Sequence, residues 1–124
     1  SEMCIRDRMS TRGLEWKENV VISSMCTVFA ESEVVSLVAQ NKDVADIIHG
    51  LNVSVASKVG ALAARLGKKN PGEYMMTGGV AKNKGIIQAL EEKLGAKLYI
   101  CDEAQLCGAL GAALFAYEKC NAAL

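Results

Sequence analysis

Apolar residues recur at intervals of three and four through the middle of the chain, which is the period of one face of an α-helix. The longest series covers 44–66 and predicts a helix that ends at Gly67, shortly before the Pro71-Gly72 pair. A second series predicts a helix over 86–94 that closes at Gly95. Each series places its apolar residues along one side of a helix.

Two more helices are predicted nearer the ends of the chain. Glu31 and Glu33 stand where the first begins, because acidic side chains favour the positive end of a helix dipole. Leu106, Leu110 and Leu114 stripe the second, whose remaining face consists of glycine and alanine. Val34, Leu37 and Val38 supply the apolar face of the first helix, so each of the two helices has an apolar face to bury.

Short apolar runs, partly β-branched, predict three strands. They cover 19–22, 74–76 and 98–100, and a Thr-Gly-Gly turn follows the second strand at 77–79. Strands and helices alternate along the chain, which predicts an α/β layered domain without internal repeats. The polar segment 1–8 shows no periodicity, so it is left out of the fold as an extraneous tail.

The chain of 124 residues is long enough for one domain with a core of its own. Its formal net charge is zero and its charges are interspersed, which argues against binding to nucleic acid or to a membrane surface. No apolar run approaches the roughly 20 residues that span a bilayer, and no apolar signal segment is visible. We therefore expect a cytoplasmic protein without nucleic-acid or membrane partners.

Five cysteines in such a chain are expected to be thiols or metal ligands rather than disulfides. No C-x-x-C pair occurs and His49 is the single histidine, which argues against a self-contained zinc site. His49 itself lies inside the long predicted helix, where a structural or surface role is expected. A bound metal would need further ligands from elsewhere.

Cys26 has the most informative position of the five. It lies in a polar loop just before a predicted helix, where free backbone N–H groups and the helix dipole stabilise a thiolate ligand. The alternative is a buried free cysteine, which is the interpretation given to Cys101 and Cys120. Cys107, in the first turn of the last helix, is assigned to packing.

The Thr77-Gly78-Gly79 turn leads from a strand into a helix. Glycines there let the backbone approach a ligand, and the helix N-terminus offers free N–H groups. The turn is not a Walker A loop, because no Gly-Lys-Ser/Thr occurs, and it is not a G-x-G-x-x-G dinucleotide fingerprint. Taken alone, the motif is also compatible with a plain turn.

Two further motifs have plain structural explanations. Gln105 stands three residues after Asp102, which is the spacing of a helix capping box. Segment 108–113, Gly-Ala-Leu-Gly-Ala-Ala, consists of small residues that let two helices pack closely. Neither motif by itself indicates a ligand.

Taken together, three segments resemble one family in order and spacing. They are Ser-Ser-Met-Cys-Thr-Val-Phe-Ala-Glu-Ser-Glu-Val at 23–34, Met-Thr-Gly-Gly-Val-Ala-Lys-Asn at 76–83, and the small-residue segment at 108–113. The chain resembles the BadF/BadG-type ATPases, and most of all the activator component of (R)-2-hydroxyacyl-CoA dehydratases. The stretch around Cys26 is specific to that group, whereas acetate and sugar kinases, chaperone ATPases and actin share the glycine motifs.

The resemblance implies an α/β, ribonuclease-H-like (actin-like ATPase) domain, of which residues 14–124 form the C-terminal half and residues 1–13 a non-matching tail. It implies a homodimer that holds one 4Fe–4S cluster between its subunits, with two cysteines from each. Cys26 matches the second of these cysteines.

The resemblance also implies a site for ATP or ADP, with Mg²⁺ in the full-length protein. Gly78 and Gly79 match the adenosine-binding turn of the family. Lys82 lies beside that turn, and Gln105 lies near the nucleotide. Segment 108–113 matches a helix at the hinge between the two halves.

The chain lacks several parts of the family pattern. The first cluster cysteine, which lies in a Cys-Ala-Ala-Gly-Thr-Gly-type loop, is missing, and so are the phosphate-binding loop and the acidic residues that position magnesium. Cys4 has none of the residues that surround the missing ligand and is not equated with it. We therefore expect a fragment that is inactive alone, and we assign it no catalytic residue.

The implied activity of the full-length protein is an anaerobic, ATP-dependent one-electron transfer. A ferredoxin- or flavodoxin-type reductant supplies the electron, and a 2-hydroxyacyl-CoA dehydratase receives it. Three alternatives stay open: the ATPase subunit of a benzoyl-CoA reductase, a sugar-kinase-like phosphotransferase without iron, and a folded fragment without function. The phosphotransferase alternative leaves Cys26 without a role.

Overall fold

The computed structural model describes residues 2–23, 26–65 and 74–122. Their α-helices are α1 (Glu2–Arg12), α2 (Thr27–Ala39), α3 (Val44–Arg65), α4 (Lys84–Leu94) and α5 (Cys107–Ala122). Short 3-10 turns form η1 (Gly13–Glu15), η2 (Gly79–Lys82) and η3 (Ala104–Leu106). Two strands, β1 (Tyr74–Met75) and β2 (Leu98–Tyr99), pair in parallel.

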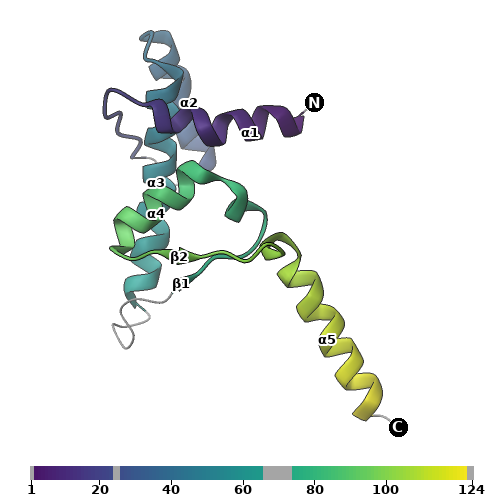
Figure 1. Cartoon of the computed structure of the whole chain (residues 1–124). Helices are drawn as coiled ribbons and strands as arrows, with labels where there is room; N and C mark the ends of the chain where they lie inside the picture. Colours follow the sequence, from purple (N-terminus) through teal and green to yellow (C-terminus); the bar gives the residue numbers. More distant parts are fainter. Residues whose placement is uncertain (1, 24–25, 66–73, 123–124) are drawn as a thin grey trace.

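Helix α3 is the element on which three of the other four described α-helices pack (Figure 1). It contacts α4 and η1 most extensively, and it also contacts α1 and α2. Among the described residues, α3 is the one helix with the length and mean hydropathy to cross a membrane. Its contacts with four other elements account for part of that apolar composition, since 28% of the apolar window is buried among the described residues.

The buried apolar side chains form two clusters along α3. In the first, Val20 and Ile22 pack with Ile47, and Val34 and Leu37 of α2 cover them. The second lies where α4 crosses α3 and joins the residues Ala56, Ala89 and Leu90 to the partly buried Met76, Ile86 and Leu98. The second cluster fixes the sheet and α4 relative to α3, and thereby positions the turn between β1 and α4.

The strand predicted over 19–22 is not formed in the described structure. The segment is extended and its side chains alternate, with Val20 and Ile22 buried and Val21 75% exposed. No described strand lies beside it to form a ladder. The β-branched run therefore encodes the extended conformation and the alternating burial, whereas strand pairing needs a neighbour that these residues do not supply.

Helix α2 forms as predicted but begins about one turn earlier than its acidic residues indicated. It begins at Thr27, so Glu31 and Glu33 lie beyond its first turn. Glu33 instead accepts hydrogen bonds from the hydroxyl of Ser23 (2.8 Å) and from its backbone N–H (3.4 Å). The side chain therefore holds the loop before the helix rather than stabilising the helix dipole.

The predicted helices over 44–66 and 86–94 are confirmed as α3 and α4. The Asn83 side chain caps α4 by accepting from the N–H of Ile86, and Gly95 ends it in the left-handed conformation with φ +66°. The expected end of α3 at Gly67 and Pro71-Gly72 lies outside the described residues. The two later strands are confirmed, each one residue shorter than predicted.

Helix α1, over residues 2–12, includes most of segment 1–8, which the sequence pattern left out of the fold. The Ser10 hydroxyl accepts a hydrogen bond from the N–H of Lys84 over 2.9 Å, and Gly13 is buried against Ile48 of α3. Next to it, Trp16 stacks on His49 with ring centroids 4.1 Å apart, which gives the histidine a structural contact. Because α1 has no apolar stripe, periodicity gave no signal for it. The domain boundary at residue 14 stays a prediction.

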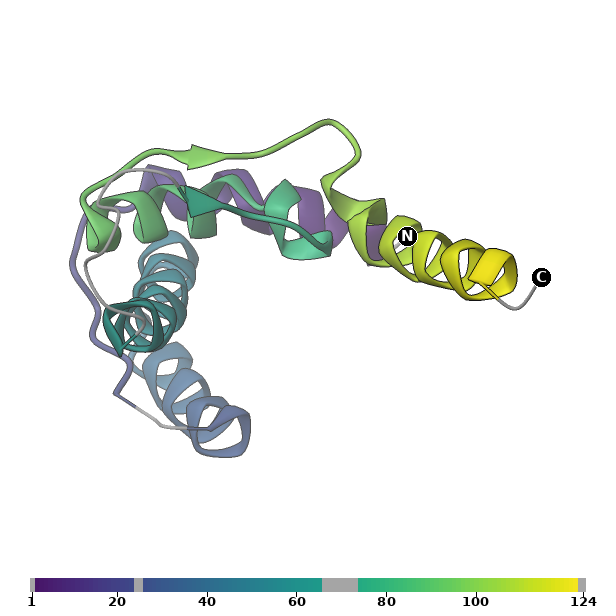
Figure 2. The same ribbon diagram turned by 90° about the horizontal axis from the view of Figure 1, so that it is seen from below.

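Helix α5 extends away from the other helices (Figure 1), and in the view from below its C-terminal end projects beyond them (Figure 2). Its main contact is with η3. The predicted leucine stripe is confirmed as helical but is not buried: Leu106, Leu110 and Leu114 are each more than half exposed. Added Cβ atoms at Gly108 and Gly111 would meet no described atom within 4 Å, so nothing in the described part of this chain packs on the small-residue face.

Candidate functional site: an open glycine turn and an exposed cysteine

The turn between β1 and α4 is held by backbone hydrogen bonds and open on its outer side. Gly78 has φ +91° and ψ 179°, a conformation that glycine adopts readily and other residues rarely do. Its N–H donates to the carbonyl oxygen of Ala104 over 2.7 Å, and its own carbonyl accepts from the N–H of Ala81 at 3.1 Å. A Cβ on Gly78 or Gly79 would meet no described atom within 4 Å, so a ligand can approach this backbone closely.

The hydrogen bond between Gly78 and Ala104 brings two distant parts of the sequence together. Ala104 begins η3, and the exposed Gln105 follows it. The exposed Lys82 ends η2 on the other side of the turn and forms no ion pair with any described residue. The structure therefore gathers Gly78, Gly79, Lys82 and Gln105, the four residues predicted for nucleotide contact, around one turn.

The capping-box interpretation of Gln105 is not supported. The residue that caps η3 is Glu103, which makes no side-chain cap, and no hydrogen bond joins Asp102 to Gln105 among the described residues. Gln105 is exposed beside η2 instead. Its amide is therefore available to a ligand at the glycine turn.

The start of α4 offers fewer free donors than its sequence suggested. Its Lys84 N–H is bound by the Ser10 hydroxyl, and its Ile86 N–H is bound by the Asn83 side chain. An anion at this helix N-terminus would have to displace those partners. The open backbone of the glycine turn is therefore the better-formed part of the candidate site.

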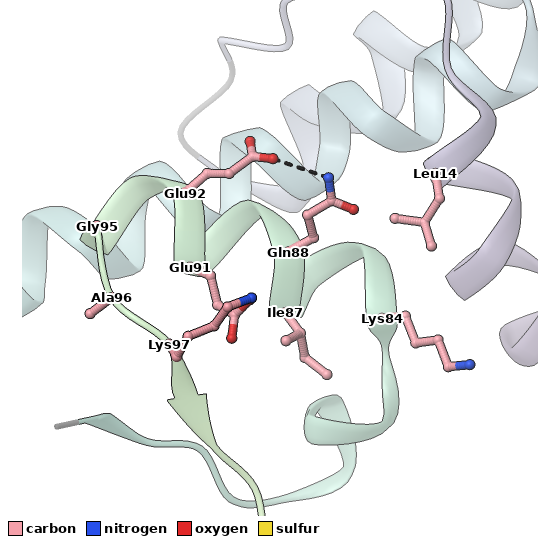
Figure 3. A pocket seen from close by; sticks show the side chains of 9 residues that line it. All are labelled: Leu14, Lys84, Ile87, Gln88, Glu91, Glu92, Gly95, Ala96 and Lys97. Atoms are coloured by element: carbon pink, nitrogen blue, oxygen red, sulfur yellow. Dashed lines mark hydrogen bonds and ion pairs between the residues drawn. The ribbon is translucent and has the colours of Figure 1, made fainter. Parts of the chain in front are cut away.

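A separate open groove of about 720 Å³ runs along α4, as Figure 3 shows. None of the four predicted nucleotide contacts lines it. Glu91, at its edge, accepts from the Lys97 ammonium at 2.8 Å and from the Leu98 N–H at 2.9 Å. These two bonds hold the pKa of Glu91 below its usual range, and the bond from Lys97 makes the larger contribution. The bond from Leu98 also ties β2 to α4. Glu91 and Lys97 therefore serve the fold.

Cys26 caps the N-terminus of α2, as its sequence position indicated. Its backbone is extended, with φ −130° and ψ 163°, and its carbonyl accepts from the N–H of Ala30 at 3.0 Å. The side chain is exposed and makes no capping hydrogen bond. Val28 and Phe29, just after it, are 71% and 69% exposed, so the thiol lies in an uncovered apolar surface.

Cys26 does not lie with the glycine turn. Helix α2 packs on α3, whereas η2 and η3 pack on each other beyond α4 (Figures 1 and 2). Among the described residues, no group of three or more His, Cys, Asp or Glu side chains could hold a metal ion. One thiol is a quarter of the ligands that a 4Fe–4S cluster needs, so Cys26 fits such a cluster only as one donor among several.

The remaining cysteines differ from their predicted roles. Cys120 is exposed on α5 rather than buried, because the helix is not covered. Cys101 is half-buried, and its Sγ lies 3.8 Å from Sγ of Cys107. Sequence reasoning missed this pair and also missed the Ala104 carbonyl, because no sequence pattern marks a contact that a turn creates.

Comparison with known proteins gives a consistent picture. The model of the BadF/BadG/BcrA/BcrD ATPase family matches residues 5–116. The chain is 51% identical over 107 residues to the (R)-2-hydroxyglutaryl-CoA dehydratase activating ATPase of Acidaminococcus fermentans, covering 86% of this chain and 40% of that protein. It is 32% identical over 107 residues to one of the benzoyl-CoA reductase subunits of Thauera aromatica, covering 80% of this chain and 38% of that one.

The fold agrees with these relationships. The activator of the 2-hydroxyisocaproyl-CoA dehydratase from Clostridium difficile, solved with bound ADPNP, superposes with a TM-score of 0.81 at 39% identity. The match covers 94% of this chain and 43% of that one. The chain thus has part of the actin-like fold of those activators, and it spans about 40% of the length of the curated relatives it matches. It belongs to the BadF/BadG/BcrA/BcrD ATPase family.

Proposed function

We propose that the full-length protein carrying this chain is an ATP-dependent activator of a 2-hydroxyacyl-CoA dehydratase. The observation that carries the proposal is the open Gly78–Gly79 turn, held by Ala104 next to Gln105, in a chain that is 51% identical to a dehydratase-activating ATPase. The substrate class and the partner follow from that relative rather than from a pocket in this chain.

The proposed nucleotide site uses the backbone of the turn and two side chains. The adenosine part of ATP or ADP would lie over Gly78 and Gly79, where no Cβ intrudes. The amide of Gln105 can donate and accept hydrogen bonds, and Lys82 offers a mobile positive charge. Phosphate positioning and Mg²⁺ binding would come from other parts of the full-length protein.

Cys26 is the proposed cluster ligand of this chain. A thiolate at a helix N-terminus is stabilised by the helix dipole, and its exposure lets ligands from another subunit reach the same metal. The exposed Val28 and Phe29 beside it suit a homodimer interface, since a symmetric contact would bury both copies of this apolar surface. A 4Fe–4S cluster held there would supply one-electron transfer, with a ferredoxin- or flavodoxin-type donor as the source of the electron.

Helix α3 offers a structural connection between the two sites. Cys26 lies at the start of α2, α2 packs on α3, and α3 packs on α4, which follows the glycine turn. A nucleotide that binds one arrangement of these helices more tightly would shift the equilibrium toward that arrangement, and the surroundings of Cys26 would change with it. The size of the shift is set by the difference in nucleotide affinity between the two arrangements.

The proposal is tested by anaerobic purification of the full-length protein. We expect iron and sulfide near four of each per dimer, and ATP-dependent activation of a 2-hydroxyacyl-CoA dehydratase given a reduced ferredoxin. Iron-free protein that phosphorylates a sugar would replace the proposal with a phosphotransferase.

The alternative electron acceptor is a benzoyl-CoA reductase, because the chain is also 32% identical to a subunit of such an enzyme. The same reduced preparation can be offered both acceptor enzymes. Benzoyl-CoA reduction without dehydratase activation would select this alternative.

A further inference from the structure

Two half-buried thiols that the proposed sites do not use lie together at the start of α5. Cys101 follows β2 and Cys107 begins α5, and their Sγ atoms are 3.8 Å apart. The Cys107 thiol donates to the carbonyl oxygen of Glu103 at 3.6 Å. Either sulfur can be the donor in the contact between the two thiols.

The segment between the two cysteines is already folded into a turn. The N–H of Ala104 donates to the Cys101 carbonyl at 3.0 Å, and the N–H of Leu106 donates to the Glu103 carbonyl at 2.7 Å. The carbonyl of Ala104 accepts from Gly78. A covalent bond between the two sulfurs would therefore close a ring around the residue that holds the glycine turn.

Two adjacent thiols can bind a soft metal ion or be oxidised to a disulfide. A thiolate metal site usually needs four ligands, and no third ligating side chain joins the pair among the described residues. A disulfide needs the two sulfurs alone, which would close from 3.8 Å to about 2.05 Å. With two sulfur atoms and no third ligand among the described residues, the pair is better suited to form a disulfide than to bind a metal ion.

We propose that Cys101 and Cys107 are a redox modification site, at which exchange with a small disulfide such as oxidised glutathione makes an intramolecular disulfide. The Cys101 thiolate attacks the small disulfide, one glutathione leaves as the thiol, and a mixed disulfide forms. The Cys107 thiol loses its proton to solvent and attacks Cys101 Sγ, which releases the second glutathione. Two protein thiols are oxidised and one glutathione disulfide is reduced to two thiols.

The order of the two attacks follows from the surroundings of Cys107. Burial raises the pKa of the Cys107 thiol, and its hydrogen bond with Cys101 adds to the increase. A thiol that keeps its proton is a poor nucleophile in a bimolecular reaction. Cys107 therefore takes the second, intramolecular attack, in which proximity compensates for low reactivity.

The disulfide would stiffen the turn that carries Ala104 and Gln105. Its effect on nucleotide binding rests on the proposed function, whereas its formation does not. The two can be measured separately, because the disulfide is detected by mass and the nucleotide by its affinity.

The test equilibrates the chain with mixtures of reduced and oxidised glutathione, in buffer and in concentrated urea, and maps the disulfides by mass spectrometry after acid quenching. Two cysteines this close in sequence also pair in an unfolded chain, so the comparison isolates the contribution of the fold. We expect the equilibrium constant for the 101–107 disulfide to be about tenfold higher in buffer, and by linkage a higher Tm for the oxidised chain.

Two variants accompany the measurement. Cys120→Ser should leave the equilibrium constant unchanged, and Cys107→Ser should leave glutathione attached to Cys101. Equal constants in buffer and urea, or pairing of other cysteines in buffer, would overturn the modification site. ADP affinity that is the same in the oxidised and reduced full-length protein would overturn the link to the nucleotide turn.

Discussion

Gly50 of α3 lies directly against the backbone of Val20, so that a Cβ added at Gly50 would come within 2.5 Å of the Val20 carbonyl oxygen. This close approach lets the extended segment 19–22 lie flat on α3 and bury Val20 and Ile22. Glycine costs helix stability at an interior position, and here the cost allows a backbone contact that no larger residue permits.

Gly50→Ala should therefore lower the free energy of unfolding by about 1–3 kcal/mol, since the carbonyl or the helix must move. Denaturant unfolding of the purified chain measures the change. Gly111→Ala is the matched control, because its Cβ meets no described atom and alanine favours the helix by up to about 1 kcal/mol. A similar loss for both substitutions would mean that the Val20 contact is not the cause.

The buried Asp46 should make the fold sensitive to acid. Its carboxylate accepts from the N–H groups of Lys17 at 2.7 Å and Glu18 at 3.0 Å, and these bonds hold its pKa below 3.8. A lowered folded-state pKa stabilises the protein above the unfolded value of 3.8, and the contribution disappears as the pH falls through the folded-state pKa.

We expect Asp46→Asn to lower the Tm at pH 7 and to flatten the fall of Tm below about pH 4. Part of the acid dependence should persist, because Glu91 titrates in the same direction. Thermal scans from pH 2 to pH 7 test this, with the exposed Glu118→Gln as the control that should leave the Tm at pH 7 unchanged. An unchanged acid profile in Asp46→Asn would contradict the role of these hydrogen bonds.

Gly79→Val separates ligand contact from fold stability. Gly79 does not have a positive φ and its Cβ position is empty, so the fold should tolerate valine. A nucleotide over the turn would meet the new side chain. In the full-length protein, the affinity for ADP should fall by about tenfold or more, a loss of about 1.4 kcal/mol, while the Tm changes little.

Gly78→Val provides the contrast, because its φ of +91° strains any other residue. This second variant should lose both ADP affinity and Tm. Calorimetric titration and thermal scans measure the two quantities. Normal ADP affinity in Gly79→Val would remove the turn from the nucleotide site.

Cys26→Ser should remove most cluster iron from the full-length protein prepared without oxygen, and dehydratase activation with it. ADP binding should persist, because α2 and the glycine turn are separate elements. Cys120→Ser is the matched control on an exposed cysteine and should leave the iron content unchanged. The variants Cys101→Ser and Cys107→Ser should also retain the cluster iron. Iron retained at one cluster per dimer after the Cys26 change would show that the ligand lies elsewhere.

The purified chain of 124 residues should hydrolyse ATP no faster than a buffer blank. Phosphoryl transfer depends on positioning and charge stabilisation of the γ-phosphate. This sequence contains no Walker A loop, and it spans 40% of the length of a dehydratase-activating ATPase. A phosphate-release assay with and without Mg²⁺ measures the rate. Magnesium-dependent turnover would mean that residues within the chain position the γ-phosphate.

The sequence alone determined the features that rest on local interactions. Helices α3 and α4 follow from apolar spacing, and the end of α4 follows from Asn83 and Gly95, whose capping contacts lie within one turn. The Gly-Gly pair likewise predicted a turn between a strand and a helix, and Cys26 was correctly placed before a helix.

Tertiary structure decided what depends on distant neighbours. Segment 19–22 has the composition of a strand, but a ladder needs a partner strand, and the described residues offer it helix α3 instead. The leucine stripe of α5 predicts a helix correctly and says nothing about what covers it. Local composition encodes a conformation, whereas burial and pairing are set by residues far away in the chain or outside it.

The same distinction applies within the candidate site. The Gly78–Ala104 hydrogen bond and the Cys101–Cys107 contact both arise from the turn around η3. No periodicity or motif marks either contact, because one is made by backbone atoms and the other by side chains that the turn brings together. The sequence therefore predicted the candidate residues, and the fold determined which of them lie together.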